Sequence, residues 1–119
     1  MTTQTAWPTQ IRVDSGRHAL QIGFDDGQNY TLSAEMLRVL SPSAEVQGHS
    51  PEERITVGGK RNVAIREVIP VGNYAIRIAF DDGHDTGIYT WDYLATLGKK
   101  REALWAAHLK ELDDKGIAR

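Results

Sequence analysis

The sequence contains one strand-and-turn pattern twice. Residues 20–27 read LQIGFDDG, and residues 76–83 read IRIAFDDG. In each copy apolar residues occupy every second position before the Asp-Gly pair, which is typical of a strand with one buried face. Asp-Gly favours the positive φ angles of a tight hairpin turn. The two copies therefore predict two β-hairpins.

The similarity continues past both turns if the second copy is given one extra residue. Return strands are then predicted at Tyr30–Leu32 and Ile88–Tyr89. Ser33 and Thr90 stand where helix N-caps belong, and each is followed two residues later by an acid, which suits the first turn of a helix. Hairpin plus capped short helix thus occurs twice, either by duplication or because the same local solution is used twice.

Weaker patterns complete the expected fold. Ile11 and Val13 predict a short first strand, and residues 63–69 predict another that Pro70 and Gly72 end. Residues 41–61 are loop-rich, with one short strand at Ile55–Val57. Gly98 is expected to end the helix after the second hairpin. An apolar stripe of helical spacing then predicts a last helix over residues 99–115. Its members are Leu104, Trp105, Leu109 and Leu112.

Together these patterns predict an α+β fold with small antiparallel or mixed β-sheets, two FDDG hairpins, short helices and a C-terminal helix. We expect a single domain over residues 1–119, with residues 99–119 as its C-terminal helical extension.

Composition excludes several functional classes. The 14 Lys and Arg residues nearly balance the 16 Asp and Glu residues, so we expect no nucleic-acid or membrane partner. The chain contains no cysteine, which excludes disulfides, thiolate metal sites and cysteine nucleophiles. The polar segment Met1–Ala6 has no signal-peptide core, and no apolar run approaches the ~20 residues that span a bilayer. We therefore expect a cytoplasmic protein.

The segment Asp81–Asp85 is the best candidate for chemistry, because three carboxylates and one imidazole occur within five residues. Such groups could bind a metal ion or exchange a proton. Their spacing fits neither an EF-hand loop nor a His-x-Asp iron motif. The alternative is a solvated turn, which the first copy supports because it lacks the histidine. His49, in a Gly/Ser/Pro-rich loop, is either functional or a local hydrogen-bond partner.

Five motifs occur in an order that resembles a known family. They are WPTQIR (7–12), FDDG (24–27), SPSAEVQGH (41–49), VGNY (71–74) and DDGHDTGIYTW (81–91). Together they look like the small bacterial proteins named for the N-terminal domain of gamma-butyrobetaine hydroxylase. The resemblance extends from about Trp7 to Leu97.

The resemblance implies a domain without the catalytic centre. In the hydroxylase this domain precedes a separate barrel that holds iron and 2-oxoglutarate, and nothing here resembles that barrel. The hydroxylase's domain holds a structural zinc ion through three cysteines and one histidine. Those positions correspond here to Ser41, Ser43, Val46 and His84. Only the histidine is kept, so the same zinc site cannot form and we expect the chain to fold without zinc.

Similar domains are fused to ATPases that carry iron–sulfur clusters. The resemblance therefore implies an accessory role near iron or iron–sulfur metabolism. Our first interpretation is a non-catalytic interaction module, without a cofactor, for a protein partner. Its expected surface comprises Ser41, Ser43, Glu45, Gln47, His49, Asp82, His84 and Asp85.

Two other interpretations stay open. One is a metal-binding protein that uses His84 with His49 or neighbouring carboxylates, and the other is a small enzyme with His84 and Asp85 as an acid–base pair. The resemblance also predicts that the loop at 41–49 and the turn at His84 are neighbours. A buried His84 bonded to Ser41 or Ser43 would indicate a polar latch, whereas an exposed His84 facing His49 would indicate ligand binding.

Overall fold

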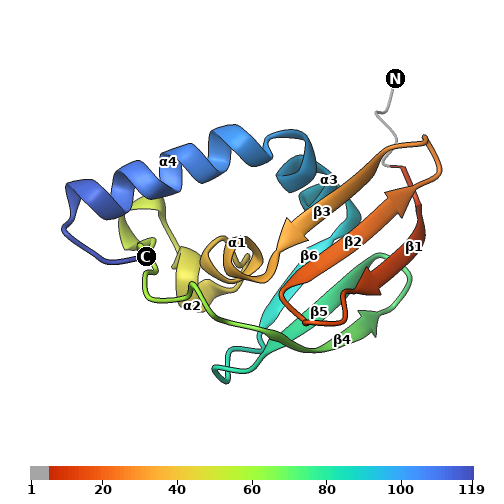
Figure 1. Cartoon of the computed structure of the whole chain (residues 1–119), viewed down its shortest axis with the longest axis horizontal. Coiled ribbons are helices and arrows are strands. Elements are labelled where there is room, and N and C mark those ends of the chain that lie inside the picture. The colour runs from red at the N-terminus through yellow and green to blue at the C-terminus, as the bar shows by residue number, and fades with distance from the viewer. Residues whose placement is uncertain (1–5) are drawn as a thin grey trace.

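The computed structural model describes residues 6–119 (Figure 1), so the segment that lacks a signal-peptide core lies almost wholly outside the described residues. Two three-stranded antiparallel sheets have the strand orders β1-β2-β3 and β4-β5-β6. The strands are β1 (Pro8–Val13), β2 (Ala19–Phe24), β3 (Asn29–Ser33), β4 (Ile65–Val71), β5 (Ala75–Phe80) and β6 (Gly87–Thr90). The helices are α1 (Ala34–Val39), α2 (Ala44–Gln47), the 3₁₀ turn η1 (Pro51–Glu53), α3 (Trp91–Lys99) and α4 (Arg101–Asp114). The predicted α+β class is confirmed.

Both FDDG segments form hairpin turns with the same hydrogen bonds. The amide of Phe24 donates to the carbonyl of Gln28 at 2.8 Å, and the amide of Phe80 donates to the carbonyl of His84 at 2.9 Å. The turn glycines have φ angles of 88° and 92°, which favour glycine over residues with a Cβ. Predicted hairpins of equal local geometry are therefore confirmed, and His84 occupies the place that Gln28 has in the first copy.

Strand register and capping confirm the rest of the repeat. Ser33 lies opposite Ala19 and Thr90 lies opposite Ala75, so the second hairpin holds the one extra residue. The Ser33 hydroxyl accepts from the Met36 amide at 3.0 Å, and the Thr90 hydroxyl accepts from the Tyr93 amide at 3.2 Å. Each hairpin thus leads directly into a capped helix, α1 or α3.

The core joins the two sheets to the helices that follow them. One cluster of buried apolar side chains draws members from both sheets and from α1 and α3. Its fully buried members include Leu20, Leu32, Ile65, Ile78 and Phe80. In β2 and β5 the alternate apolar positions that predicted the strands now line the core.

Two strand predictions are wrong in detail. Residues Ile55–Val57 form no strand, because the chain there follows η1 as an irregular segment whose Ile55 side chain is exposed. Strand β4 passes through Pro70 and ends at Val71, directly before Gly72, the second predicted terminator. Proline is tolerated there because β4 is an edge strand, so its missing N–H interrupts no ladder on the outer side.

The helical predictions need three corrections. Gly98 lies within α3, where a Cβ would approach the Tyr30 ring to 2.3 Å, so close packing rather than helix termination explains the glycine. The last helix is α4, one or two residues shorter at each end than predicted. Leu109 on α4 is exposed, and His108 takes the buried place on that face.

The chain beyond α4 turns back beneath that helix (Figure 1). Gly116 has a φ of 65°, and the amide of Ile117 donates to the carbonyl of Leu112 at 2.9 Å. The amide of Gly59 then donates to the carbonyl of Ala118 at 3.0 Å, which fixes the tail against the irregular segment. Among residues 6–119, none of the helices has the length and apolar character needed to span a bilayer.

Candidate functional site

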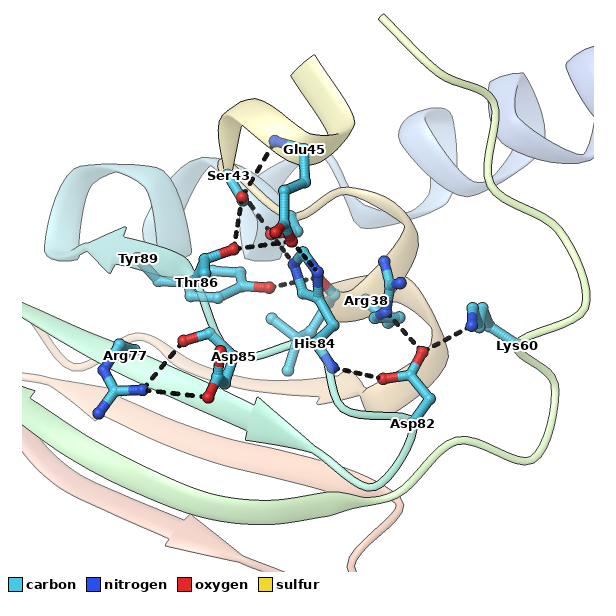
Figure 2. A network of polar contacts seen from close by, with 12 residues as sticks. Arg38, Ser43, Glu45, Lys60, Arg77, Asp82, His84, Asp85, Thr86 and Tyr89 are labelled. Atoms are coloured by element: carbon cyan, nitrogen blue, oxygen red, sulfur yellow. Dashed lines mark hydrogen bonds and ion pairs between the residues drawn. The ribbon is translucent and has the colours of Figure 1, made fainter. Parts of the chain in front are cut away.

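The candidate site lies where the segment after α1 meets the second hairpin turn (Figure 2). Ser41 follows the end of α1, and Ser43 caps α2 by accepting from the amide of Glu45 at 3.1 Å. The turn after β5 carries His84 and Thr86 to this segment. The predicted neighbourhood of loop and turn is therefore present in the structure.

His84 is buried, with 7% of its surface exposed, and both ring nitrogens have partners. Nδ1 lies 3.0 Å from Glu45 Oε1, and Nε2 lies 2.9 Å from Ser41 Oγ. An ionised carboxylate can only accept, so Nδ1 carries the proton and Nε2 accepts from the Ser41 hydroxyl. The Ser41 oxygen in turn accepts from the amide of Ser43 at 3.2 Å. This arrangement matches the latch alternative.

Thr86 closes the network on its solvent side. Its hydroxyl donates to Glu45 Oε1 at 3.0 Å and accepts from the Ser43 hydroxyl at 2.7 Å. Every donor in the chain of contacts therefore finds an acceptor, as buried polar groups require. We call these five residues, Ser41, Ser43, Glu45, His84 and Thr86, the polar latch.

Gly87 permits the close approach on which the latch depends. A Cβ at this position would lie 2.5 Å from Ser41 Oγ and 3.0 Å from the Tyr89 ring. Tyr89 is fully buried beneath the latch, and its hydroxyl donates to the carbonyl of Leu37. Gly87, in the hairpin that holds the extra residue, thus lets Ser41 reach the turn.

A second polar group fixes the other side of the turn. Asp82 Oδ2 lies 2.8 Å from Arg38 Nε and 2.6 Å from Lys60 Nζ, while Oδ1 accepts from the amide of His84 at 3.1 Å. Burial raises the pKa of Asp82, but the hydrogen bonds from Lys60, the His84 amide and Arg38 outweigh it and lower that pKa to about 2. Asp82 is therefore a charged anchor for the turn.

The surroundings of His84 favour its neutral form. Burial is the largest cause and lowers its pKa, and the charge of Arg38 lowers it further. The carboxylates of Glu45 and Asp82 act in the opposite direction without reversing the shift. A neutral ring is also what the latch needs, because a protonated Nε2 could not accept from Ser41.

The His84 pKa predicts a dependence of stability on pH. An unfolded histidine titrates near pH 6.5, and the native His84 titrates at a lower value, so the unfolded chain binds the proton first as pH falls. The free energy of unfolding should therefore decrease as the pH falls from about 6.5 to the lower native pKa. His108 also has a pKa lowered by burial, and it acts in the same direction.

Urea unfolding at pH 7 and at about pH 5 measures this loss. The matched control is His84→Gln, which keeps the contribution of His108 and removes that of His84. We expect a smaller loss of stability in the variant than in the wild type. Equal losses in the two proteins would show that His84 keeps its ordinary pKa in the native state.

The remaining predicted site residues are divided between the latch and the surface. Gln47 donates from Nε2 to the carbonyl of Ser41 at 2.9 Å, which supports the latch segment. Asp85 is half-buried and lies 3.9 Å from Arg77, away from the His84 ring. His49 is exposed, and among residues 6–119 its ring makes no hydrogen bond or ion pair. The structure therefore does not bring His49 to His84.

Three residues of the site were not predicted from the sequence: Arg38, Lys60 and Thr86. Arg38 and Lys60 come from segments that no local pattern links to the turn. Thr86 lay within the quoted motif 81–91, and its position next to the histidine turn was the available signal.

The residues at the corresponding zinc positions do not fit a zinc ion. Ser41 and Ser43 carry hydroxyls that are used within the latch, and Val46 is a buried apolar side chain. In the part of the chain that the structure describes, no three His, Asp or Glu side chains are grouped to hold a metal ion.

We accordingly predict that treatment with EDTA leaves the melting temperature of the purified protein unchanged, because Ser41, Ser43 and Val46 supply no thiolate ligands for a structural zinc ion. Thermal unfolding with and without the chelator tests this, and elemental analysis of the same sample provides the control. A chelator-induced loss of stability together with stoichiometric zinc would contradict the prediction.

Comparisons with known proteins place the chain in a family. Residues 11–95 match the family model described as gamma-butyrobetaine hydroxylase-like, N-terminal. Two solution NMR structures are similar to this chain. One shares 43% identity at TM-score 0.83, over 98% of this chain and 91% of the other. The second shares 45% identity at TM-score 0.84, over 100% of this chain and 90% of the other.

A third structure, a crystal structure, comes from Acidithiobacillus ferrooxidans and is of a protein of unknown function in the DUF971 family. It shares 37% identity at TM-score 0.67, over 82% of this chain and 98% of the other. A comparison with curated proteins gave no match. The chain therefore belongs to the family of gamma-butyrobetaine hydroxylase-like N-terminal domains.

Proposed function

We propose that this chain is a non-catalytic interaction domain, and the observation that carries the proposal is the full use of both His84 ring nitrogens within the latch. A general acid or base must have a ring nitrogen within reach of substrate. The proposed acid–base partner Asp85 faces Arg77 instead. The segment Asp81–Asp85 is thus better explained as a structural element that holds the neighbouring surface in a fixed conformation.

The surface beside the latch has the character of a binding site. The Glu45 side chain is 62% exposed although its carboxylate anchors His84, and Asp85 and Arg77 add charges of both signs. Ile88 projects from the edge strand β6 with 43% of its surface exposed. An exposed apolar residue among rigidly held charges suits recognition of a protein partner, because charge sets specificity and apolar contact adds affinity.

A narrower proposal concerns the partner's identity. Membership of the family supports a cytoplasmic partner that handles iron or iron–sulfur clusters, and this narrower form rests on the family resemblance alone. Mass spectrometry of the captured proteins tests the identity of the partner, independently of whether the proposed surface binds a protein.

The experiment compares two charge-altered variants in affinity capture from a native lysate. The test variant, Asp85→Lys with Ile88→Ser, changes the proposed surface and leaves the latch intact. The control variant, Lys110→Glu with Asp114→Lys, reverses an exposed ion pair on α4. We expect a protein captured by the wild type and the control to be absent from the test variant. Equal capture by all three, or no specific capture by any, would refute the proposal.

A further inference from the structure

A buried carboxylate on α1 lies away from the latch. Glu35 is only 6% exposed, yet a carboxylate in the interior is costly unless a cation pairs with it. Its partner is Arg119, which donates from Nε to Oε2 at 3.1 Å and from Nη2 to Oε1 at 3.1 Å. In the described part of the chain no other group donates a hydrogen bond to this carboxylate.

An aromatic wall completes the site. The Arg119 guanidinium carbon lies 5.4 Å from the centre of the Trp105 ring, a distance at which the ring attracts a cation. The surrounding pocket has a volume of about 410 Å³ and is lined by Glu35, Met36, Trp105 and Arg119 among others. Arg101 and Glu102 also line the pocket with opposite charges, so Glu35 would be its net charge once Arg119 leaves.

We propose that this pocket is a binding site for a guanidinium group, that Arg119 fills it from within the same chain, and that an arginine side chain of a protein partner competes for it. The site already holds the planar fork of a guanidinium group on a buried carboxylate, with an aromatic face beside it. Two parallel N–H···O bonds select guanidinium over ammonium, because only the guanidinium fork matches both carboxylate oxygens.

The internal ligand can leave without disturbing the core. Arg119 lies three residues after Gly116, its side chain is 40% exposed, and two backbone hydrogen bonds hold the tail. A tethered side chain competes at an effective concentration on the order of millimolar, so a free ligand binds weakly while Arg119 is in place. This inference does not depend on the polar latch or on the surface proposed beside it.

The test uses N-acetyl-arginine amide as the probe and N-acetyl-citrulline amide as its neutral isostere, with binding followed by NMR at the Trp105 indole N–H. In the Arg119→Ala variant we expect saturable shifts with the arginine probe, at an affinity about tenfold or more above that of the wild type. The double variant Glu35→Gln with Arg119→Ala should lose this binding and keep its fold.

Two results would overturn the proposal. One is equal binding of the citrulline and arginine probes, and the other is the absence of saturable shifts in Arg119→Ala. If that variant does not fold, the wild type gives the answer: a high concentration of the arginine probe should shift the amide signals of Ala118 and Arg119, and unchanged signals would show that the ion pair is only a structural clasp.

Discussion

Replacing Phe80 by alanine is expected to lower the free energy of unfolding by about 3–5 kcal/mol, the usual cost of deleting a buried aromatic side chain. Phe80 ends β5 with 0% of its surface exposed and belongs to the cluster that joins the two sheets. Its ring centre also lies 6.2 Å from that of His84, so the residue supports the latch from below. Loss of the ring would leave a cavity between the sheet and the turn.

Urea unfolding followed by tryptophan fluorescence measures this effect. The matched control is Ile88→Ala, a large apolar residue on the neighbouring strand that is exposed to solvent. The control should change stability by no more than about 0.5 kcal/mol. A Phe80→Ala variant as stable as this control would show that the apolar face of β5 has been assigned wrongly.

Ser41→Ala is expected to cost about 1–3 kcal/mol, because it leaves buried polar groups without partners. The hydroxyl donates to His84 Nε2 and accepts from the amide of Ser43, and it is fully buried. Water cannot easily replace it, since Gly87 packs directly against the Ser41 oxygen. The cost should therefore exceed that of removing an exposed serine hydroxyl.

A double-mutant cycle with His84→Ala separates the latch from simple loss of packing. If the two side chains act together, the double variant should lose less stability than the two single variants added. Ser15→Ala, at an exposed turn position, is the control for the loss of a hydroxyl. Strict additivity of Ser41 and His84 would contradict a functional hydrogen bond between them.

The parts of the fold that local chemistry determines could be predicted from the sequence. Asp-Gly turns, strands of period two and hydroxyl caps each depend on residues a few positions apart. The errors arise where distant segments decide the outcome. Gly98 is a packing glycine because Tyr30 lies against it, and Leu109 is exposed because His108 occupies the buried face of α4.

The candidate site shows the same division. The pairing of Ser41 with His84 was predicted through the resemblance to the hydroxylase's domain, which implied that these positions are neighbours. Arg38 and Lys60 join the site through the fold alone, because each reaches Asp82 from a segment remote in sequence. The Glu35–Arg119 pair could not be predicted for the same reason, because the two residues are 84 positions apart in the sequence.

The protonation of the His84 ring tests most directly the central claim that this histidine is a structural latch. Long-range nitrogen–proton NMR correlations at pH 7 report which ring nitrogen carries the proton. The structure predicts a neutral ring with the proton on Nδ1, bonded to Glu45, and an unprotonated Nε2 that accepts from Ser41. A cationic ring, a ring that averages between both tautomers, or Nε2 signals that move on addition of zinc would contradict the latch.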